Sequence, residues 1–223
     1  AAFLSGAAVT PEMIRLWKDD LRARNYVPST INTYLAALNG FFRFCGWADC
    51  RARFLKIQRR LFRDSKRELT RAEYERLVAA AEAAGDRGLA LLMETICSTG
   101  IRVSEVQYIT VEAAKNGKTE IALKGKIRTI LLPSKLCRKL LKYAARQKTA
   151  SGAIFRTKSG KAMSRYQIWS KMKKLCVRAG VDAGKVFPHN LRHLFATAFY
   201  RAYKDIVKLA DVLGHSSIET TRI

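Results

Sequence analysis

The chain has 223 residues, 48% apolar and 27% charged, and its 42 Lys and Arg against 18 Asp and Glu give a formal net charge of +24. No apolar run approaches the ~18 to 20 residues that a membrane span needs, and the opening AAFLSGAAV lacks the basic flank of a signal peptide. So large an excess of positive charge favours a polyanionic partner, most commonly nucleic acid. Charge alone leaves a ribosomal or other RNA-coating protein open.

The cysteines indicate the redox environment of the chain. There are five, an odd number, and none forms a C-x-x-C pair. We therefore expect a reducing compartment and no disulfide framework.

The first predicted unit, residues 1–62, contains only helices. Thr10-Pro11-Glu12 is typical of a helix start, with a capping hydroxyl and a proline in the first turn. A second helix is predicted from about Ser29, where apolar residues recur at helical spacing. Aromatic packing is expected to hold this unit together through Trp17, Tyr34, Phe41, Phe42 and Trp47.

A charge-dense stretch, Gln58–Arg67, separates this unit from the rest of the chain. We interpret it as exposed and take residues 63–67 as the linker to a second unit, residues 68–223.

The second unit is predicted to be helical with one small antiparallel sheet. Two short aliphatic and β-branched segments, Thr119–Leu123 and Arg128–Leu132, are the predicted strands, joined through Lys124-Gly125-Lys126. Capping boxes, glycines and prolines predict helices over 70–84, 89–98, 103–109, 134–146, 164–180, 189–203 and 205–213, and another from 217. The fold class is therefore mainly α, a small all-helical domain followed by an α+β domain.

All three histidines, His189, His193 and His215, lie near the end of the chain. His189 and His193 are spaced to bind zinc on one helix face, but the zinc-protease motif needs a glutamate beside its first histidine, and this chain reads H-N-L-R-H. No cysteine or carboxylate cluster lies nearby in the sequence. We therefore expect no metal site.

The same region suits phosphodiester transfer without a metal. Negative charge grows on the non-bridging oxygens, and arginine, which keeps its proton and chelates phosphate, is suited to face it. Lysine and histidine can move the protons of the nucleophile and the leaving oxygen. The chain supplies Arg102 in STGIRVSE, Arg192 in HNLRH, Lys124 on the hairpin and His215 after a glycine.

Three ordered motifs resemble the boxes of the tyrosine site-specific recombinases, which include phage and transposon integrases and Xer proteins. They are T-G-x-R-x-x-E (Thr99–Glu105), H-x-L-R-H (His189–His193) and L-G-H-S-S-I-x-T-T-x-I (Leu213–Ile223). A K-G hairpin lies between the first two, as in that family, and the resemblance covers essentially the whole chain.

The resemblance implies a role for each matching residue. Arg102 and Arg192 clamp the scissile phosphate, and Glu105 supports them by orienting the site. His189 and His215 hydrogen-bond the phosphate and assist proton transfer. The reaction uses no cofactor and passes through a 3′-phosphotyrosyl intermediate.

The general acid that protonates the 5′-oxygen leaving group is less clearly assigned. Lys126 and Arg128 compete with Lys124 on the hairpin. We favour Lys124 because its K-G context matches the family.

The resemblance also implies how DNA is held. Residues 1–62 correspond to a SAM-like core-binding domain and residues 68–223 to the catalytic domain, which together form a C-shaped clamp on duplex DNA. Most contacts should be to phosphates, which set position rather than sequence. Our candidates for DNA binding are Thr30, Asn32, Thr33, Arg43, Lys126, Arg128, Arg165 and Gln167.

One residue of the family pattern is absent. The nucleophilic tyrosine is expected directly after Ile223, and no tyrosine follows His215. Tyr200 and Tyr203 precede it on a helix that we expect to bury them. We therefore expect a truncated chain that binds DNA without cleaving it.

The expected partners are double-stranded DNA with specific recombination sites and other copies of the chain, as a homotetramer on paired sites. The expected location is the prokaryotic cytoplasm, in association with the nucleoid, with no membrane contact. Alternatives are a non-enzymatic DNA-binding regulator derived from a recombinase, a type IB topoisomerase-like activity, and a metal-dependent nuclease.

Overall fold

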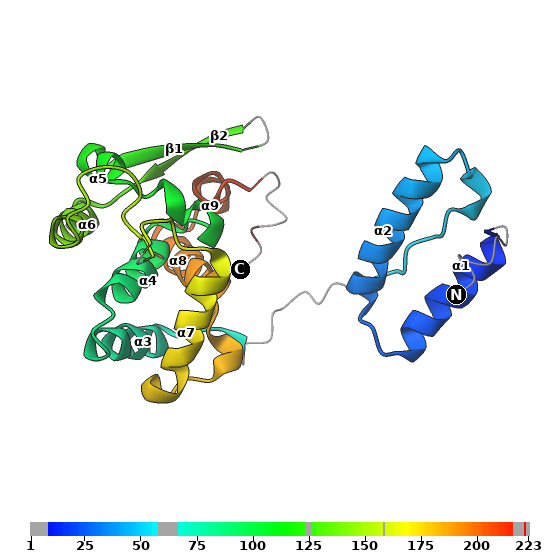
Figure 1. Cartoon of the computed structure of the whole chain (residues 1–223), viewed down its shortest axis with the longest axis horizontal. Coiled ribbons are helices and arrows are strands. Elements are labelled where there is room, and N and C mark those ends of the chain that lie inside the picture. The colour runs from blue at the N-terminus through cyan, green and yellow to red at the C-terminus, as the bar shows by residue number, and fades with distance from the viewer. Residues whose placement is uncertain (1–8, 58–66, 124–125, 158, 216–220, 222–223) are drawn as a thin grey trace. The chain divides into compact units, whose positions relative to one another are not determined.

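The computed structural model describes residues 9–57, 67–123, 126–157, 159–215 and 221, with the side chains of 123 and 126 left out. The chain separates into two compact units, Ala1–Arg63 and Asp64–Ile223, each with its own core (Figure 1).

The first unit is a pair of helices closed by an extended segment. The helices are α1 (Pro11–Ala23) and α2 (Pro28–Phe44), followed by the short 3-10 helix η2 (Ala48–Cys50). Thr10 caps α1 as predicted, since its hydroxyl accepts from the Met13 amide at 3.3 Å. The buried core of the unit is formed by Ile14, Leu21, Ile31, Leu35, Phe42 and Cys50.

This core is more aliphatic than the sequence analysis expected. Among the aromatic residues Phe42 is fully buried, whereas Phe41 is 51% exposed and Trp47 is 44% exposed. The rings of Phe41 and Trp47 meet edge to face with centroids 6.0 Å apart, outside the aliphatic contacts.

Two asparagines of α2 fasten the extended segment that follows η2. Asn39 exchanges two hydrogen bonds with the backbone of Ala52, both at 2.9 Å. Asn32, two helical turns earlier, does the same with Leu55 at 2.9 and 2.7 Å. The side-chain amide of Asn32 therefore fastens this segment, and its contact with DNA stays a prediction.

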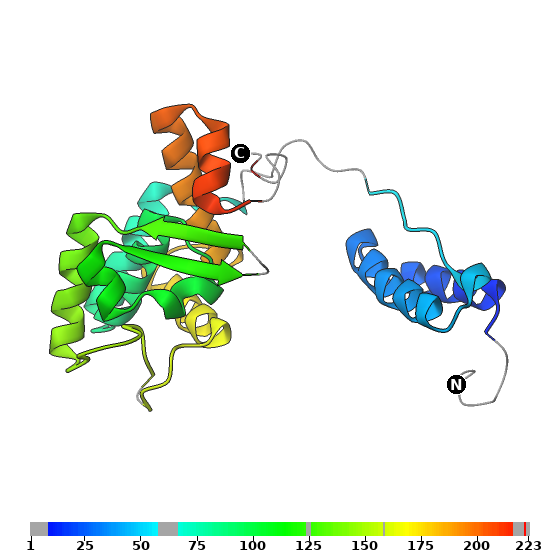
Figure 2. The same cartoon turned by 90° about the horizontal axis from the view of Figure 1, so that it is seen from above.

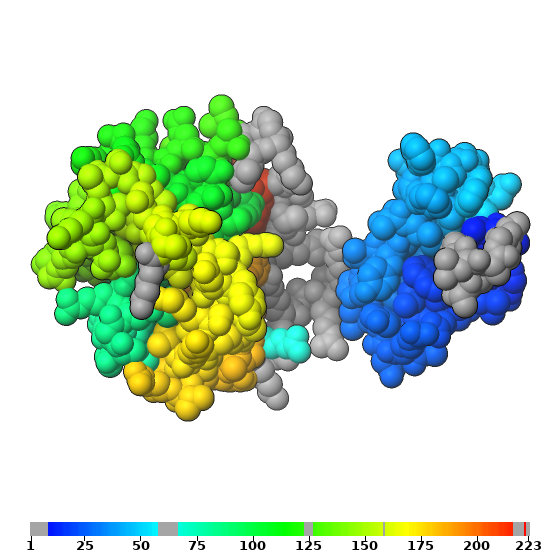
Figure 3. Space-filling view, viewed as in Figure 1, coloured from blue at the N-terminus to red at the C-terminus, as the bar shows by residue number. Residues whose placement is uncertain are grey.

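The second unit contains a central helix, α4 (Arg87–Thr99), surrounded by other helices. Helices α3, α6, α7 and α8 contact it, and in Figure 3 the yellow surface of α7 covers much of the visible face of this unit. The other α-helices are α3 (Arg71–Ala83), α5 (Val111–Asn116), α6 (Ser134–Arg146), α7 (Arg165–Ala179), α8 (Pro188–Tyr203) and α9 (Ile206–Leu213). The 3-10 helices are η4 (Val103–Tyr108) and η5 (Ala183–Lys185).

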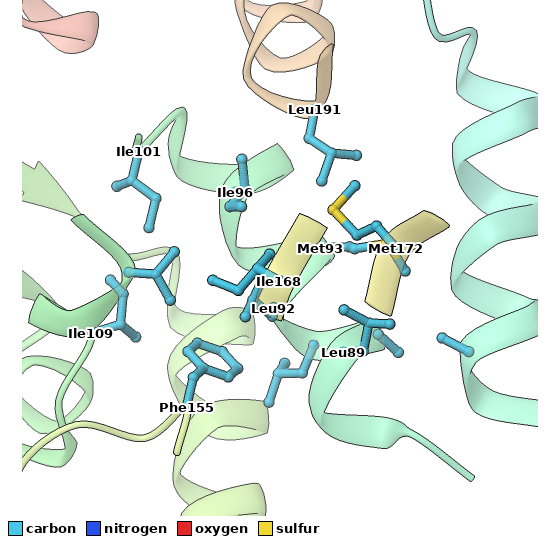
Figure 4. Close-up of a cluster of buried hydrophobic side chains, with 14 of the residues drawn as sticks. Leu89, Leu92, Met93, Ile96, Ile101, Ile109, Phe155, Ile168, Met172 and Leu191 are labelled. Carbon is cyan, nitrogen blue, oxygen red and sulfur yellow. The ribbon is translucent and has the colours of Figure 1, made fainter. Parts of the chain in front are cut away.

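The core of the second unit is built around the apolar face of α4. Leu92, Met93 and Ile96 are completely buried and lie close to residues of α7, α8 and the intervening loops (Figure 4). Removing such a side chain costs about 2–5 kcal/mol because the surroundings cannot fully collapse. This packing fixes the segment that follows α4 and the segment that leads into α8.

The predicted hairpin is present as two antiparallel strands, β1 (Lys118–Leu123) and β2 (Lys126–Leu131), side by side in Figure 2. Successive side chains of a strand point to opposite faces. Ile130 is 3% exposed and Ile127 is 74% exposed, so the face of β2 that carries Ile130 is turned toward the protein. Arg128, which pairs with Ile121 across the sheet, is on that inner face.

Three features differ from the sequence analysis or lie beyond it. Helix α5 was not predicted, and residues 103–108 form a 3-10 helix instead of an α-helix. The helix predicted from residue 217 lies outside the described residues. Tyr203 is 61% exposed and stacks on Phe199, so α8 does not bury it as expected.

None of the helices in the described part of the chain combines the length and hydropathy of a membrane span. All five cysteines are free thiols.

Candidate active site

The end of α4 places Arg102. Gly100 closes the helix with a positive φ of 65°, and a Cβ there would lie 2.4 Å from the ring of Phe195. Glycine is therefore required both for the turn and for the close approach of α8. The chain then enters η4, with Arg102 directly before its first residue.

Glu105 fixes the direction of Arg102. Its carboxylate is only 1% exposed and accepts from the backbone amide and the NH1 group of Arg102, both at 2.8 Å. The Arg102 side chain is 40% exposed, so its guanidinium reaches solvent while Glu105 holds it in place. Its NH2 group donates to the carbonyl of Gly214 at 3.0 Å.

Arg192 enters the same place from the first turns of α8. It is 4% exposed and donates from NH1 to the Gly100 carbonyl and from NH2 to the Leu213 carbonyl, both at 2.6 Å. Arg102 and Arg192 thus bind neighbouring carbonyls at the end of α9. Two guanidinium groups far apart in the sequence meet at one point.

His215 joins this cluster after the turn that closes α9. Its Nε2 lies 3.0 Å from NH2 of Arg192, and its Nδ1 lies 2.8 Å from the hydroxyl of Thr221. An arginine can only donate, so Nε2 must accept and Nδ1 carries the proton, which it donates to Thr221. The neutral imidazole is therefore held as a single tautomer.

Burial and crowding of positive charge shape the titration of the site. Burial, then Arg102 and Arg128, lower the pKa of Arg192 to about 9, which leaves it charged at neutral pH. Burial and the charges of the three arginines, followed by that of His189, lower the pKa of His215 to about 4. Three guanidinium groups face one carboxylate, so the cluster attracts an anion.

Arg128, which we predicted as a DNA contact, belongs to this cluster. Its side chain is 10% exposed, and its NH1 group donates to both carboxylate oxygens of Glu105 at 3.3 and 3.0 Å. Its Nε donates to the carbonyl of Val212 at 3.0 Å. These bonds hold the guanidinium against protein groups of η4 and α9.

The other predicted catalytic residues are placed less completely. His189 lies exposed in the first turn of α8, near enough to His215 to affect its pKa. Lys124 lies outside the described residues, and of Lys126 only the backbone, as the first residue of β2, is described. His193 lies 4.0 Å from a carboxylate oxygen of Glu68, apart from the arginine cluster.

The remaining predicted DNA contacts lie on helix surfaces. In unit 1, Arg43 and Thr33 are exposed on α2 and Thr30 is half-buried, while the Thr33 hydroxyl donates to the Ser29 carbonyl at 3.0 Å. In unit 2, Arg165 and Gln167 are exposed in the first turn of α7, where Gln167 forms a capping box with Ser164.

Sequence reasoning missed several parts of the site. The carbonyls of Gly100, Leu213 and Gly214 accept hydrogen bonds from its arginines. A pattern of side chains does not predict which backbone carbonyls become acceptors. Thr221 lies within the third motif and is 2% exposed, but it was not predicted as a residue of the site. Within the described ranges, no group of three or more His, Cys, Asp or Glu residues could hold a metal ion.

Comparison with known proteins agrees with this geometry. Residues 67–223 match the Phage integrase family. Tyrosine recombinase XerA of Pyrococcus furiosus is 32% identical over 214 residues, covering 91% of this chain and 71% of the relative. Tyrosine recombinase XerD of Vibrio cholerae is 27% identical over 217 residues, covering 91% and 72%.

Solved structures show the same fold at lower identity. XerH site-specific recombinase bound to its difH substrate aligns with a TM-score of 0.75 at 21% identity, over 96% of this chain and 66% of that one. A lambda integrase dimer bound to a COC′ core site aligns with a TM-score of 0.75 at 17% identity, over 96% and 80%.

The fold and the arginine cluster define a recombinase-type enzyme. The chain belongs to the phage integrase family. The two relatives compared above are both tyrosine recombinases.

Proposed function

We propose that this protein carries out site-specific DNA recombination by metal-free strand cleavage and rejoining. The observation that carries the proposal is the convergence of Arg102 and Arg192 on the end of α9, beside His215. Such a cluster of fixed positive groups suits a phosphate whose charge grows in the transition state.

In the proposed reaction the oxygen of a tyrosine attacks a backbone phosphorus and loses its proton. The 5′-oxygen leaves and takes a proton from Lys124, or from Lys126 as the alternative, and the 3′-phosphate stays on the tyrosine. Arg102 and Arg192 hold the phosphate, Glu105 orients Arg102, and His189 and His215 assist proton transfer. A 5′-hydroxyl of another strand then reverses the step and joins the new ends.

Within the 223 residues no tyrosine follows His215. The family register puts the nucleophile directly after Ile223. Cleavage experiments therefore use the chain continued by a tyrosine at that position, called here the tyrosine-continued chain.

We further propose that duplex DNA contacts both units. The net charge of +24 supports this, as do the exposed positions of Arg43 on α2 and Arg165 on α7. The remaining candidate contacts are Thr30, Asn32, Thr33, Lys126 and Gln167. A homotetramer on paired sites, in the nucleoid of a prokaryotic cell, completes the proposal.

The test is cleavage of a duplex that the chain itself selects from a random-sequence pool. Arg192→Ala in the tyrosine-continued chain should lower the cleavage rate by about 10²-fold or more, by analogy with the loss of a preorganised charge stabiliser. DNA affinity should change far less, because Arg192 would contact one phosphate among the many that the protein neutralises. Cleavage at the unaltered rate would contradict the assigned role.

A further inference from the structure

The end of α9 is bound by arginines in an unusual way. Its last carbonyls, those of Val212, Leu213 and Gly214, are successive in the chain, and each accepts from a different arginine. Carbonyls at a helix end lack partners within the helix and carry the negative end of its dipole. Here they form a backbone surface on which three guanidinium groups are arranged side by side.

The arginines that bind Leu213 and Gly214 already have a proposed role, whereas the one that binds Val212 does not. Arg128 comes from β2, and its hydrogen bonds to Glu105 and Val212 join that strand to both η4 and α9. Its NH2 group is buried and has no hydrogen-bond partner among the described residues. An unpaired buried donor costs about 1–3 kcal/mol, whereas the other donors of Arg128 pair with Glu105 and Val212.

Arg128 orients the Glu105 carboxylate, which in turn orients Arg102. It donates to both oxygens of Glu105, which fixes the plane of that group. The same two oxygens accept from the backbone and from NH1 of Arg102. The Arg102 side chain is more exposed than that of Arg128. Its direction therefore depends on the Glu105 carboxylate, which Arg128 fixes from the buried side.

We propose that Arg128 is a positioning residue of the phosphate site, acting on Arg102 through Glu105 and on the end of α9 through Val212. The inference rests on the proposed function, since it deepens the assignment of that site. Arg128 contacts no substrate itself. It aligns two chain segments so that Arg102 and Arg192 face one phosphate.

The experiment compares Arg128→Lys and Arg128→Met in the tyrosine-continued chain, on the selected duplex carrying a nick that traps the cleaved product. Arg128→Met should lower the cleavage rate at saturating DNA by about tenfold or more, as loss of an orienting partner does in other sites. Arg128→Lys should recover only part of the rate, because an ammonium cannot reproduce the planar fork. DNA affinity should stay within about twofold, since the hydrogen bonds of Arg128 are to protein groups, Glu105 and Val212.

Arg76→Met is the matched control. Arg76 also binds the carbonyls at a helix end, those of Ala179 and Gly180, at 3.1 and 3.4 Å, and these acceptors close α7 rather than α9. It should leave the cleavage rate unchanged. A loss equal to that of Arg128→Met would mean that any arginine cap in this unit matters, and would overturn the inference.

A double-mutant cycle tests the route through Glu105. If Arg128 acts through that carboxylate, then Arg128→Lys and Glu105→Gln together should slow cleavage much less than the product of their separate effects. Multiplicative effects would overturn the inference. Where Arg128→Met does not fold, Arg128→Lys decides alone, and an unaltered rate for it counts against the inference.

The failure of the inference and that of the proposed function can be told apart. No cleavage by the tyrosine-continued chain, or no effect of Arg192→Ala, overturns the proposed function and this inference with it. Normal cleavage by the Arg128 variants beside an inactive Arg192→Ala overturns the inference alone.

Discussion

Thr221 is the residue on which the orientation of His215 depends. Its hydroxyl accepts the Nδ1 proton, which leaves Nε2 free to accept from Arg192. Thr221→Val keeps the shape and removes the acceptor, so we expect a loss of about 1 kcal/mol in the free energy of unfolding. Cleavage by the tyrosine-continued chain should also slow, whereas Thr221→Ser should behave as the unaltered chain. Equal rates for the valine and serine variants would show that the hydroxyl is dispensable.

His215 should remain neutral well below neutral pH. Burial and three neighbouring arginines lower its pKa to about 4, against about 6.5 in an unfolded chain. Between those values the unfolded chain binds a proton that the folded chain refuses, so the free energy of unfolding falls as pH decreases through this window. An NMR titration should show no change in the His215 ring signals from pH 8 to about 5.5. A midpoint near 6.5 would mean that the imidazole is not buried among the arginines.

At the scale of single residues, the sequence predicted the charged residues of the site better than it predicted their hydrogen-bond partners. Arg102, Arg192 and His215 stand in motifs whose chemistry could be argued from phosphate transfer, and the structure brings them together. The contacts of Asn32 with Leu55, and of Arg128 with Glu105 and Val212, were not predicted, because these partners come from distant segments of the chain. The alternation of β2, with Ile130 facing inward, could have placed Arg128.

The turn after α9 is the element that joins the arginines to His215. Gly214 has a φ of 63°, and a Cβ there would lie 2.4 Å from Cδ of Arg128. Gly180 ends α7 with a φ of 58° and has open space around it. Gly180→Ala should therefore cost only the left-handed strain of about 1–2 kcal/mol. Gly214→Ala should cost more and should also slow cleavage, as measured by thermal denaturation and the nicked-duplex assay; equal effects of the two variants would contradict this account.

The helices were predictable where their ends carry caps. Thr70 and Ser164 begin α3 and α7 through capping boxes, as predicted from their spacing to Glu73 and Gln167. Helix α5 was missed because it has only six residues, too few to show an apolar period. The 3-10 form of η4 follows from the Arg102–Glu105 contacts, which the sequence suggests only once the site is known.

The charge of the whole molecule sets how its DNA affinity responds to salt. Each phosphate contact should contribute ~0.9 to the slope of log affinity against log salt concentration. Arg43→Ala in unit 1 and Arg165→Ala in unit 2 should each lower the slope by that amount, because both side chains are exposed. Arg15, exposed on α1 but paired with Glu12 at 2.6 Å, supplies the control, and Arg15→Ala should leave the slope unchanged. An unchanged slope for Arg43→Ala or Arg165→Ala would remove that residue from the DNA surface.

The most direct test of the phosphate clamp is the covalent protein–DNA link that it should produce. The chain continued after Ile223 by a tyrosine, and the same chain continued by a phenylalanine, are incubated with the selected duplex in the presence of a metal chelator and run on a denaturing gel. The account predicts a protein–DNA band for the tyrosine chain, none for the phenylalanine chain, and loss of the band with Arg192→Ala. A band of undiminished strength in the Arg192→Ala variant, or no band with the tyrosine chain, would contradict it.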